Sequence, residues 1–108
     1  MRDKRYYSLG KVKHLISQGK VKFDGDALDF AKEDFGWGID DIFSAFRCLR
    51  ETDWHKSSPK TTNPDKGIQL DYYRSFNLKG EKVFTHFYIK DDTLFIDSFH
   101  DIDRRRGR

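Results

Sequence analysis

In the first half of the chain, apolar residues recur at the three- and four-residue spacing of amphipathic helices. A first helix is predicted over residues 9–18, with Ser8 as its N-cap and Gly19 after its end. A second helix is predicted over residues 25–35 and ends at Gly36. A third helix has the clearest apolar stripe, which consists of Ile39, Ile42, Phe43, Phe46 and Leu49.

From residue 53 onward the period changes to two, and the residue types are those that favour pleated sheets. Residues 20–23 also alternate, which predicts a short strand or an extended linker. Short turns at Lys79-Gly80 and Asp91-Asp92 suit hairpins between strands. The four predicted strands are residues 53–58, 68–77, 82–90 and 93–100. This order predicts an α+β fold, with about three N-terminal helices packed on one face of a mostly antiparallel, roughly four-stranded sheet.

The composition suits one small folded domain that spans residues 1–108. Hydrophobic residues make up only 36%, but ten Phe, five Tyr and two Trp can bury a large apolar area. No apolar run is long enough for a membrane helix and no signal segment occurs, so we expect a cytoplasmic protein without membrane contact. Cys48 is the single cysteine, and neither metal-ligand spacing nor a glycine-rich nucleotide loop occurs. We therefore expect no metal and no small-molecule cofactor.

Charge is unevenly distributed along the chain, although the net charge is only +3. Residues 1–22 carry seven basic residues and one acidic residue, whereas residues 23–55 carry three basic and nine acidic residues. Residues 101–108, which contain four arginines, predict a basic and flexible C-terminal tail. This distribution favours a basic face that attracts polyanions, and the alternative is a solvated surface without a ligand.

The predicted strand over residues 82–90 carries an aromatic ring, an imidazole and a phenol in a row. Phe84, His86 and Tyr88 share one face because successive strand residues alternate between faces. Such a row can stack a nucleic-acid base and hold a phosphate. The alternative is an exposed face of the sheet that only contacts water.

The other strands add further polar groups to this picture. Alternation predicts that Lys56 shares a face with Trp54, and that His100 shares a face with Leu94 and Ile96. If the sheet is antiparallel, these groups can converge at one end with residues of the second strand. Those residues are Gln69, Tyr73 and Arg74.

Four short motifs, in this order and spacing, resemble the MqsR family. They are Lys11-Val12-Lys13-His14-Leu15-Ile16, Thr52-Asp53-Trp54-His55-Lys56-Ser57, Asp71-Tyr72-Tyr73-Arg74 and Ser98-Phe99. Members of that family are toxins of bacterial type II toxin–antitoxin pairs and have a RelE-like fold. The resemblance implies a cytoplasmic, metal-independent endoribonuclease that cleaves mRNA and causes growth arrest. It also implies inhibition by a cognate, MqsA-like antitoxin protein.

The resemblance carries over to the active-site positions only in part. The family's lysine falls on Lys56, which matches. The family's glutamine position is Leu70 here, with Gln69 one residue earlier, and such an offset turns a strand side chain to the other face unless a bulge intervenes. The family's tyrosine falls on Phe84, and its last lysine falls on His100. This chain is therefore either a divergent nuclease or one with reduced activity.

Metal-free RNA cleavage needs a base for the 2′-OH, cations for the phosphorane and an acid for the 5′-oxygen. His86 and His100 are the predicted acid–base pair, since an unperturbed imidazole titrates near 6.5. Lys56 and Arg74 are the predicted phosphate clamp. Gln69 is a further catalytic candidate, and the predicted substrate contacts are Phe84, Tyr88 and Tyr73.

Two alternatives remain open from the sequence. The first is a binding module without catalysis that uses the same face to hold RNA or a protein. The second is an interaction domain whose acidic segment, residues 23–55, meets a basic partner.

Overall fold

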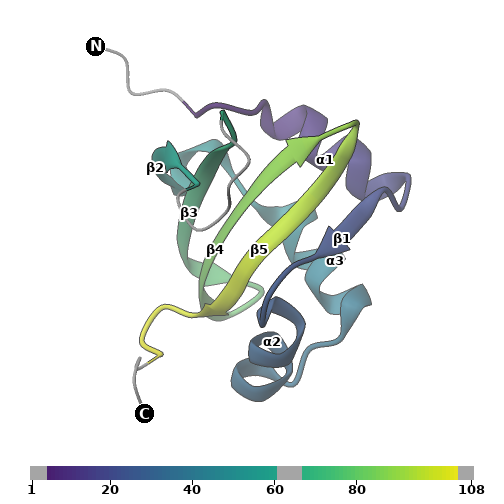
Figure 1. Cartoon of the computed structure of the whole chain (residues 1–108). Coiled ribbons are helices and arrows are strands. Elements are labelled where there is room, and N and C mark those ends of the chain that lie inside the picture. Colours follow the sequence, from purple (N-terminus) through teal and green to yellow (C-terminus); the bar gives the residue numbers. More distant parts are fainter. Residues whose placement is uncertain (1–4, 61–66, 105–108) are drawn as a thin grey trace.

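The computed structural model of the protein describes residues 5–60 and 67–104 (Figure 1). The helical first half and the strand-rich second half match the sequence-based expectation. The elements in chain order are α1 (Leu9–Ser17), β1 (Val21–Phe23), α2 (Ala27–Phe35), α3 (Ile39–Cys48), the 3-10 turn η1 (Glu51–Asp53), β2 (Trp54–Pro59), β3 (Gln69–Leu78), β4 (Glu81–Lys90) and β5 (Thr93–Asp101).

The described strands form one sheet of five strands in the order β1-β5-β4-β3-β2. Strands β2 to β5 pair antiparallel with their neighbours, and β1 pairs parallel with β5. The predicted α+β class is confirmed. The sheet has one strand more than the predicted four, because residues 21–23 pair with β5 instead of forming a linker.

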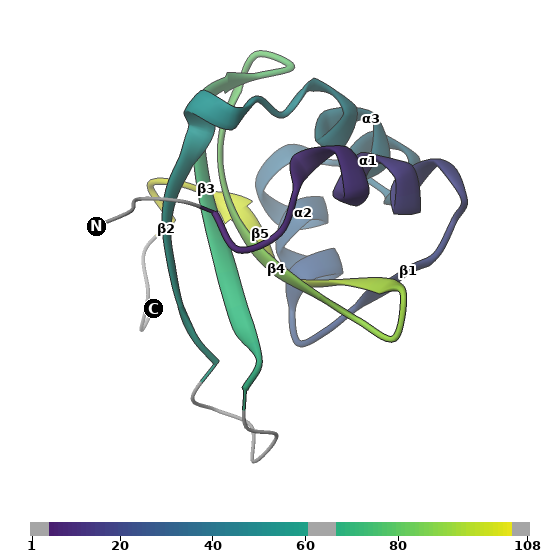
Figure 2. The same cartoon turned by 90° about the horizontal axis from the view of Figure 1, so that it is seen from above.

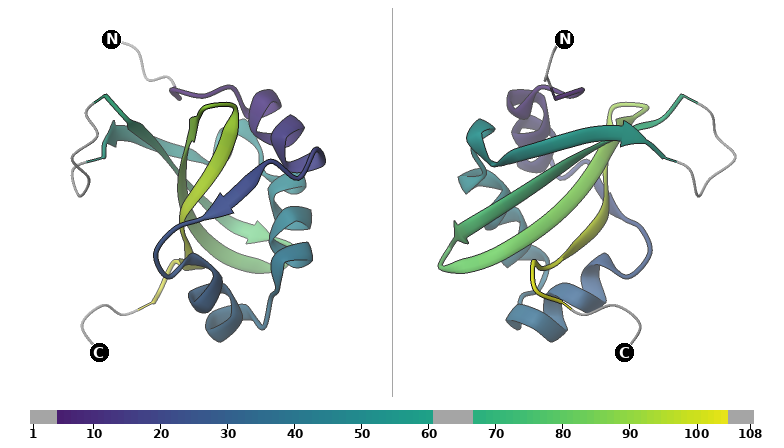
Figure 3. Two further views of the ribbon diagram at one scale, coloured as in Figure 1. Left: turned by 45° about the vertical axis from the view of Figure 1, so that its right-hand side comes forward. Right: turned by 90° about the vertical axis from the view of Figure 1, so that its left-hand side faces the viewer.

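All three helices lie on the same face of the sheet, and the opposite face is open (Figures 2 and 3). Most of the stripe predicted for α3 packs into the core, since Ile42, Phe46 and Leu49 are at most 1% exposed, but Ile39 at the start of the helix is 47% exposed. The centroid of the Phe46 ring lies 5.6 Å from that of Phe87 on β4 and 5.9 Å from that of Phe99 on β5. The aromatic side chains thus form a buried core although hydrophobic residues make up a low share of the chain.

Local signals in the sequence fix the ends of these elements. The Ser8 hydroxyl accepts a hydrogen bond from the Lys11 N–H at 3.2 Å and caps α1 as predicted. Gly36 ends α2 with φ of 74°, in the left-handed region where glycine has no steric penalty. Asp91 and Asp92 both have positive φ, which matches the predicted tight hairpin turn between β4 and β5.

Candidate functional site

A bulge in β5 determines which of its side chains reach the open face. Ile96 pairs with Phe87, whereas Ser98 pairs with His86, so Asp97 is an extra residue in β5. The bulge reverses the alternation of faces. Ile96 is therefore buried beneath the helices, and His100 lies on the open face. The prediction that His100 shares a face with Leu94 and Ile96 is wrong for this reason.

A second bulge, in β2, places Lys56. Trp54 pairs with Tyr73, and Lys56 pairs with the adjacent Tyr72, which leaves His55 as the extra residue. Trp54 packs against the core on the helix side, whereas Lys56 is exposed on the open face. The prediction that Lys56 and Trp54 share a face is therefore also wrong.

The bulge in β5 and the register of β3, β4 and β5 build a hollow of about 400 Å³ on the open face. We call it the histidine hollow. It is lined by Tyr72, Phe84, His86, Ser98, His100, Ile102 and Arg104. The Phe84 ring stacks on His100 with centroids 5.0 Å apart and meets His86 edge-on at 5.6 Å. The two predicted acid–base histidines thus both contact one aromatic ring, His100 across the strands and His86 along β4.

His86 is held by the extra residue of β5. Its Nδ1 lies 3.2 Å from Oδ2 of Asp97, and Oδ1 of Asp97 accepts a hydrogen bond from Nζ of Lys60 at 3.3 Å. The adjacent His86 lowers the pKa of the Asp97 carboxyl, against the opposing effect of burial, and Lys60 lowers it further. Asp97 is therefore a carboxylate at neutral pH. The Nδ1 edge of the imidazole faces this carboxylate at ion-pair distance but makes no hydrogen bond of regular geometry with a described residue, and Nε2 lies on the opposite edge of the ring.

His100 is held by its own strand end. Its Nδ1 lies 2.8 Å from the carbonyl oxygen of Asp101, and a carbonyl oxygen only accepts, so Nδ1 carries the proton in this contact. Burial lowers the pKa of His100 below its usual 6.5, because a low-dielectric environment disfavours the imidazolium. At neutral pH, His100 is therefore a neutral ring with a free electron pair at Nε2.

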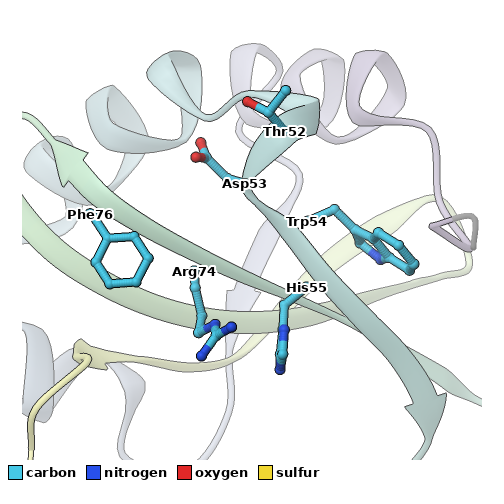
Figure 4. A pocket seen from close by; sticks show the side chains of 6 residues that line it. All are labelled: Thr52, Asp53, Trp54, His55, Arg74 and Phe76. Atoms are coloured by element: carbon cyan, nitrogen blue, oxygen red, sulfur yellow. The ribbon is translucent and has the colours of Figure 1, made fainter.

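Lys56 and Arg74 supply positive charge beside the hollow. Nζ of Lys56 lies over the Tyr72 ring at 4.9 Å from its centroid, and the Tyr72 ring is 4.5 Å from that of His86. Arg74 pairs with Phe84 across β3 and β4 but extends into a neighbouring, smaller hollow (Figure 4). Lys56 thus contacts Tyr72, which lines the histidine hollow, whereas Arg74 lines the neighbouring hollow.

Three of the predicted site residues do not join this cluster. Tyr73 is 1% exposed in the core beneath the helices, and burial raises the pKa of its phenol. Gln69 shares the helix-covered face with Tyr73, and no bulge intervenes between it and Tyr72. The Tyr88 ring stacks on Phe95 at 4.9 Å, farther along β4. The structure brings together Lys56, Phe84, His86 and His100, and it leaves Gln69, Tyr73 and Tyr88 apart.

Sequence reasoning missed Tyr72, Asp97 and Arg104. Alternation along residues 68–77 could have placed Tyr72 beside Arg74, whereas no sequence signal marks the bulge at Asp97.

Residues 101–104 of the predicted tail are within the described part of the chain, and residues 105–108 lie outside it. Arg104 lies against α2, where its guanidinium pairs with Asp34 at 2.6 Å and Glu33 at 2.8 Å and lies 3.6 Å from the centre of the Phe30 ring.

In residues 5–60 and 67–104, no helix has the length and apolar character needed to cross a membrane. The same residues contain no group of three or more His, Cys, Asp or Glu side chains placed to hold a metal ion.

The fold and the site define a small α+β domain whose sheet presents a basic face rich in imidazole and aromatic rings. The sequence matches the model of the family described as "Motility quorum-sensing regulator, toxin of MqsA" over residues 4–101. The chain therefore belongs to the MqsR toxin family, and it is a toxin of a toxin–antitoxin system with a cognate antitoxin as its partner. A comparison with curated proteins finds no match.

Proposed function

We propose that this toxin is an endoribonuclease that cleaves mRNA by attack of a 2′-OH on the adjacent phosphate, without a metal ion. The observation that carries the proposal is that His86 and His100 line one hollow and both contact Phe84. Two positioned imidazoles can supply the base and the acid of this reaction. All the groups that the reaction needs are thus present as side chains.

His100 acts as the general base in this proposal. It is neutral at physiological pH, and its Nδ1–H is engaged by the Asp101 carbonyl, so Nε2 can accept the 2′-OH proton. As that proton leaves, the 2′-oxygen forms a bond to phosphorus, and negative charge accumulates on the phosphorane oxygens.

His86 acts as the general acid, and Lys56 stabilises the phosphorane. The Asp97 carboxylate faces Nδ1 of His86 and offsets the positive charge of an imidazolium. Nε2 then donates its proton to the 5′-oxygen as the P–O5′ bond breaks. The products are a 2′,3′-cyclic phosphate and a 5′-hydroxyl, and His100 ends protonated. In this proposal the phosphate oxygens are held by the ammonium of Lys56, which is exposed above Tyr72.

Phe84 occupies the position of the family's tyrosine and lacks its hydroxyl, so it contributes a stacking surface and no proton. Tyr72, whose ring is 5.9 Å from that of Phe84, widens this surface toward Lys56. The bases that flank the cut would stack on these two rings.

The identity of the partner follows from the same family. The family's description names it as the toxin of MqsA, which supports an MqsA-like protein as the cognate antitoxin. An mRNA substrate also places the toxin in the cytoplasm, where its activity would arrest growth.

The test is incubation of the purified, antitoxin-free protein with a mixed mRNA in EDTA. We expect discrete fragments from the wild type, a rate about a hundredfold lower for Lys56→Ala, and comparable losses for His86→Ala and His100→Ala. Lys22→Ala, an exposed lysine on β1, is the matched control and should cleave like the wild type. Intact RNA that remains bound to the wild type would instead establish a binding module on this scaffold.

A further inference from the structure

The open face has a second hollow, next to the first. It has a volume of about 190 Å³, and we call it the arginine hollow. It is lined by Thr52, Asp53, Trp54, His55, Arg74 and Phe76. In Figure 4, the Arg74 side chain lies between the Phe76 ring and the His55 imidazole. The guanidinium of Arg74 and the imidazole of His55 point in the same direction.

The guanidinium of Arg74 is available to a ligand. Among the described residues, no side chain or carbonyl makes a hydrogen bond or an ion pair with it. An exposed arginine with five donors and no protein acceptor is suited to a phosphate, which it can bind in a bidentate manner. This sets Arg74 apart from Arg104, which two carboxylates already engage.

Phe76 is the most exposed large hydrophobic residue in the described part of the chain, at 66%. It follows Arg74 by two positions on β3, and both side chains line the arginine hollow (Figure 4). A largely exposed ring beside a cation that no described acceptor engages is unfavourable for a surface with no ligand, but it suits the base and phosphate of one nucleotide.

His55 adds an uncharged polar ring to the hollow. Partial burial and the positive charges of Arg74 and Lys56 lower the pKa of His55, so it is neutral at physiological pH. The only carboxylate that lines the hollow is Asp53, which accepts a hydrogen bond from the Arg50 N–H at 2.9 Å. A phosphate of a bound nucleotide is therefore expected beside Arg74 and away from the carboxylate of Asp53.

The register joins the two hollows. His100, Phe84 and Arg74 are direct neighbours across β5, β4 and β3, so they form one row about 10 Å long. Sheets in known RNA-binding modules stack two or three bases across such a width. A single RNA strand that crosses the β-strands can thus contact both hollows.

We propose that the arginine hollow is a second nucleotide subsite for single-stranded RNA, in which Phe76 stacks a base and Arg74 holds the neighbouring phosphate. The inference rests on the proposed function, because it takes RNA as the ligand of the open face. It does not require that the RNA be cleaved.

The test measures binding alone, with an eight-nucleotide 2′-O-methyl RNA of mixed sequence that carries a fluorophore. This probe has no free 2′-OH and cannot be cut. Fluorescence anisotropy at several salt concentrations gives the Kd and its salt dependence. We expect Phe76→Ala to raise the Kd about fivefold or more with an unchanged salt slope. We expect Arg74→Ala to raise the Kd and to flatten the slope of log K against log salt by about 0.7.

Matched controls lie on the helix side of the molecule. Ile39→Ala removes an apolar side chain that is 47% exposed at the start of α3, and Arg47→Ala removes an exposed arginine from the same helix. Both should bind like the wild type.

The outcomes separate this inference from the nuclease proposal. Weaker binding by both site variants supports the subsite even if the wild type cleaves no RNA. Wild-type affinity and salt slope in both variants, or no binding of the probe by the wild type, overturns the subsite even if cleavage occurs.

Discussion

The Asp34 carboxylate on α2 accepts a hydrogen bond from the Asp101 N–H at the end of β5, at 2.9 Å. Its other oxygen pairs with Arg104 at 2.6 Å. Because the carbonyl of Asp101 engages Nδ1 of His100, one carboxylate ties the helical layer to the strand end that orients this histidine. The support of His100 therefore lies partly on a different element from His100 itself.

We expect Asp34→Ala to lower the free energy of unfolding by about 1–3 kcal/mol. The Asp34 side chain is only 15% exposed, and its loss leaves the Asp101 N–H and the Arg104 guanidinium without this acceptor. Glu33→Ala is the matched control, since Glu33 pairs with the same arginine but is 61% exposed, and we expect a loss of less than about 0.5 kcal/mol. Urea unfolding measures both values. Equal losses would show that Asp34 does not fasten the strand end.

We expect Tyr73→Phe to leave RNA cleavage unchanged and to raise the free energy of unfolding by about 1 kcal/mol. The Tyr73 hydroxyl is buried and has no hydrogen-bond partner among the described residues, and such a group costs free energy in the folded state. Urea unfolding and the cleavage rate are the measurements. A large loss of cleavage with intact stability would return Tyr73 to the site.

The pH dependence of cleavage tests His100 as the base. Because burial holds its pKa below 6.5, kcat/KM should rise with pH along a limb whose apparent pKa lies below 6.5. Above that limb the base is neutral, and the rate should level off. A lower limb centred above pH 6.5 would contradict the assignment.

The lowered pKa of His100 also predicts that the free energy of unfolding changes with pH. The unfolded chain, with the usual pKa of 6.5, binds more protons than the folded chain at pH values between the two pKa values. The free energy of unfolding should therefore decrease as the pH falls from 6.5 through the folded pKa. His100→Gln should remove this part of the pH dependence, and an unchanged profile in urea titrations would show that His100 titrates normally.

We expect Asp97→Asn to reduce kcat about tenfold to a hundredfold with little change in KM. The neutral amide removes the negative charge that faces Nδ1 of His86 at 3.2 Å, and the loss of this electrostatic contact falls on the transition state. Asp92→Asn is the matched control, since Asp92 is an exposed partner of Lys11 and Lys20 and should cleave normally. An increase in KM alone would show that Asp97 acts on binding and not on His86.

The helices and strands could be predicted from the sequence because periodicity and end signals act locally. Ser8, Gly36 and the apolar stripe of α3 each set an element by themselves. The faces of two strands could not be predicted in the same way. Extra residues at His55 and Asp97 reverse the alternation, and a bulge depends on the pairing of distant strands, which alternation alone does not encode.

The site was accordingly predicted in part. Lys56, Phe84, His86 and His100 do meet on the open face. Arg104 was missed because a run of arginines near the chain end resembles a solvated tail, and only the contact with α2 shows its position. Tyr73 was included because a tyrosine next to an arginine resembles a substrate contact, although alternation places it in the core.

The central claim is that the 2′-OH of the RNA is the nucleophile. The most direct test uses a defined RNA in EDTA, beside the same RNA with one 2′-deoxy residue at the mapped cut site. The account predicts that the all-ribose RNA is cut to a 2′,3′-cyclic phosphate and a 5′-hydroxyl, and that the 2′-deoxy RNA resists at that site. Cleavage of the 2′-deoxy RNA at the same position, or cleavage that occurs only with added metal, would contradict it.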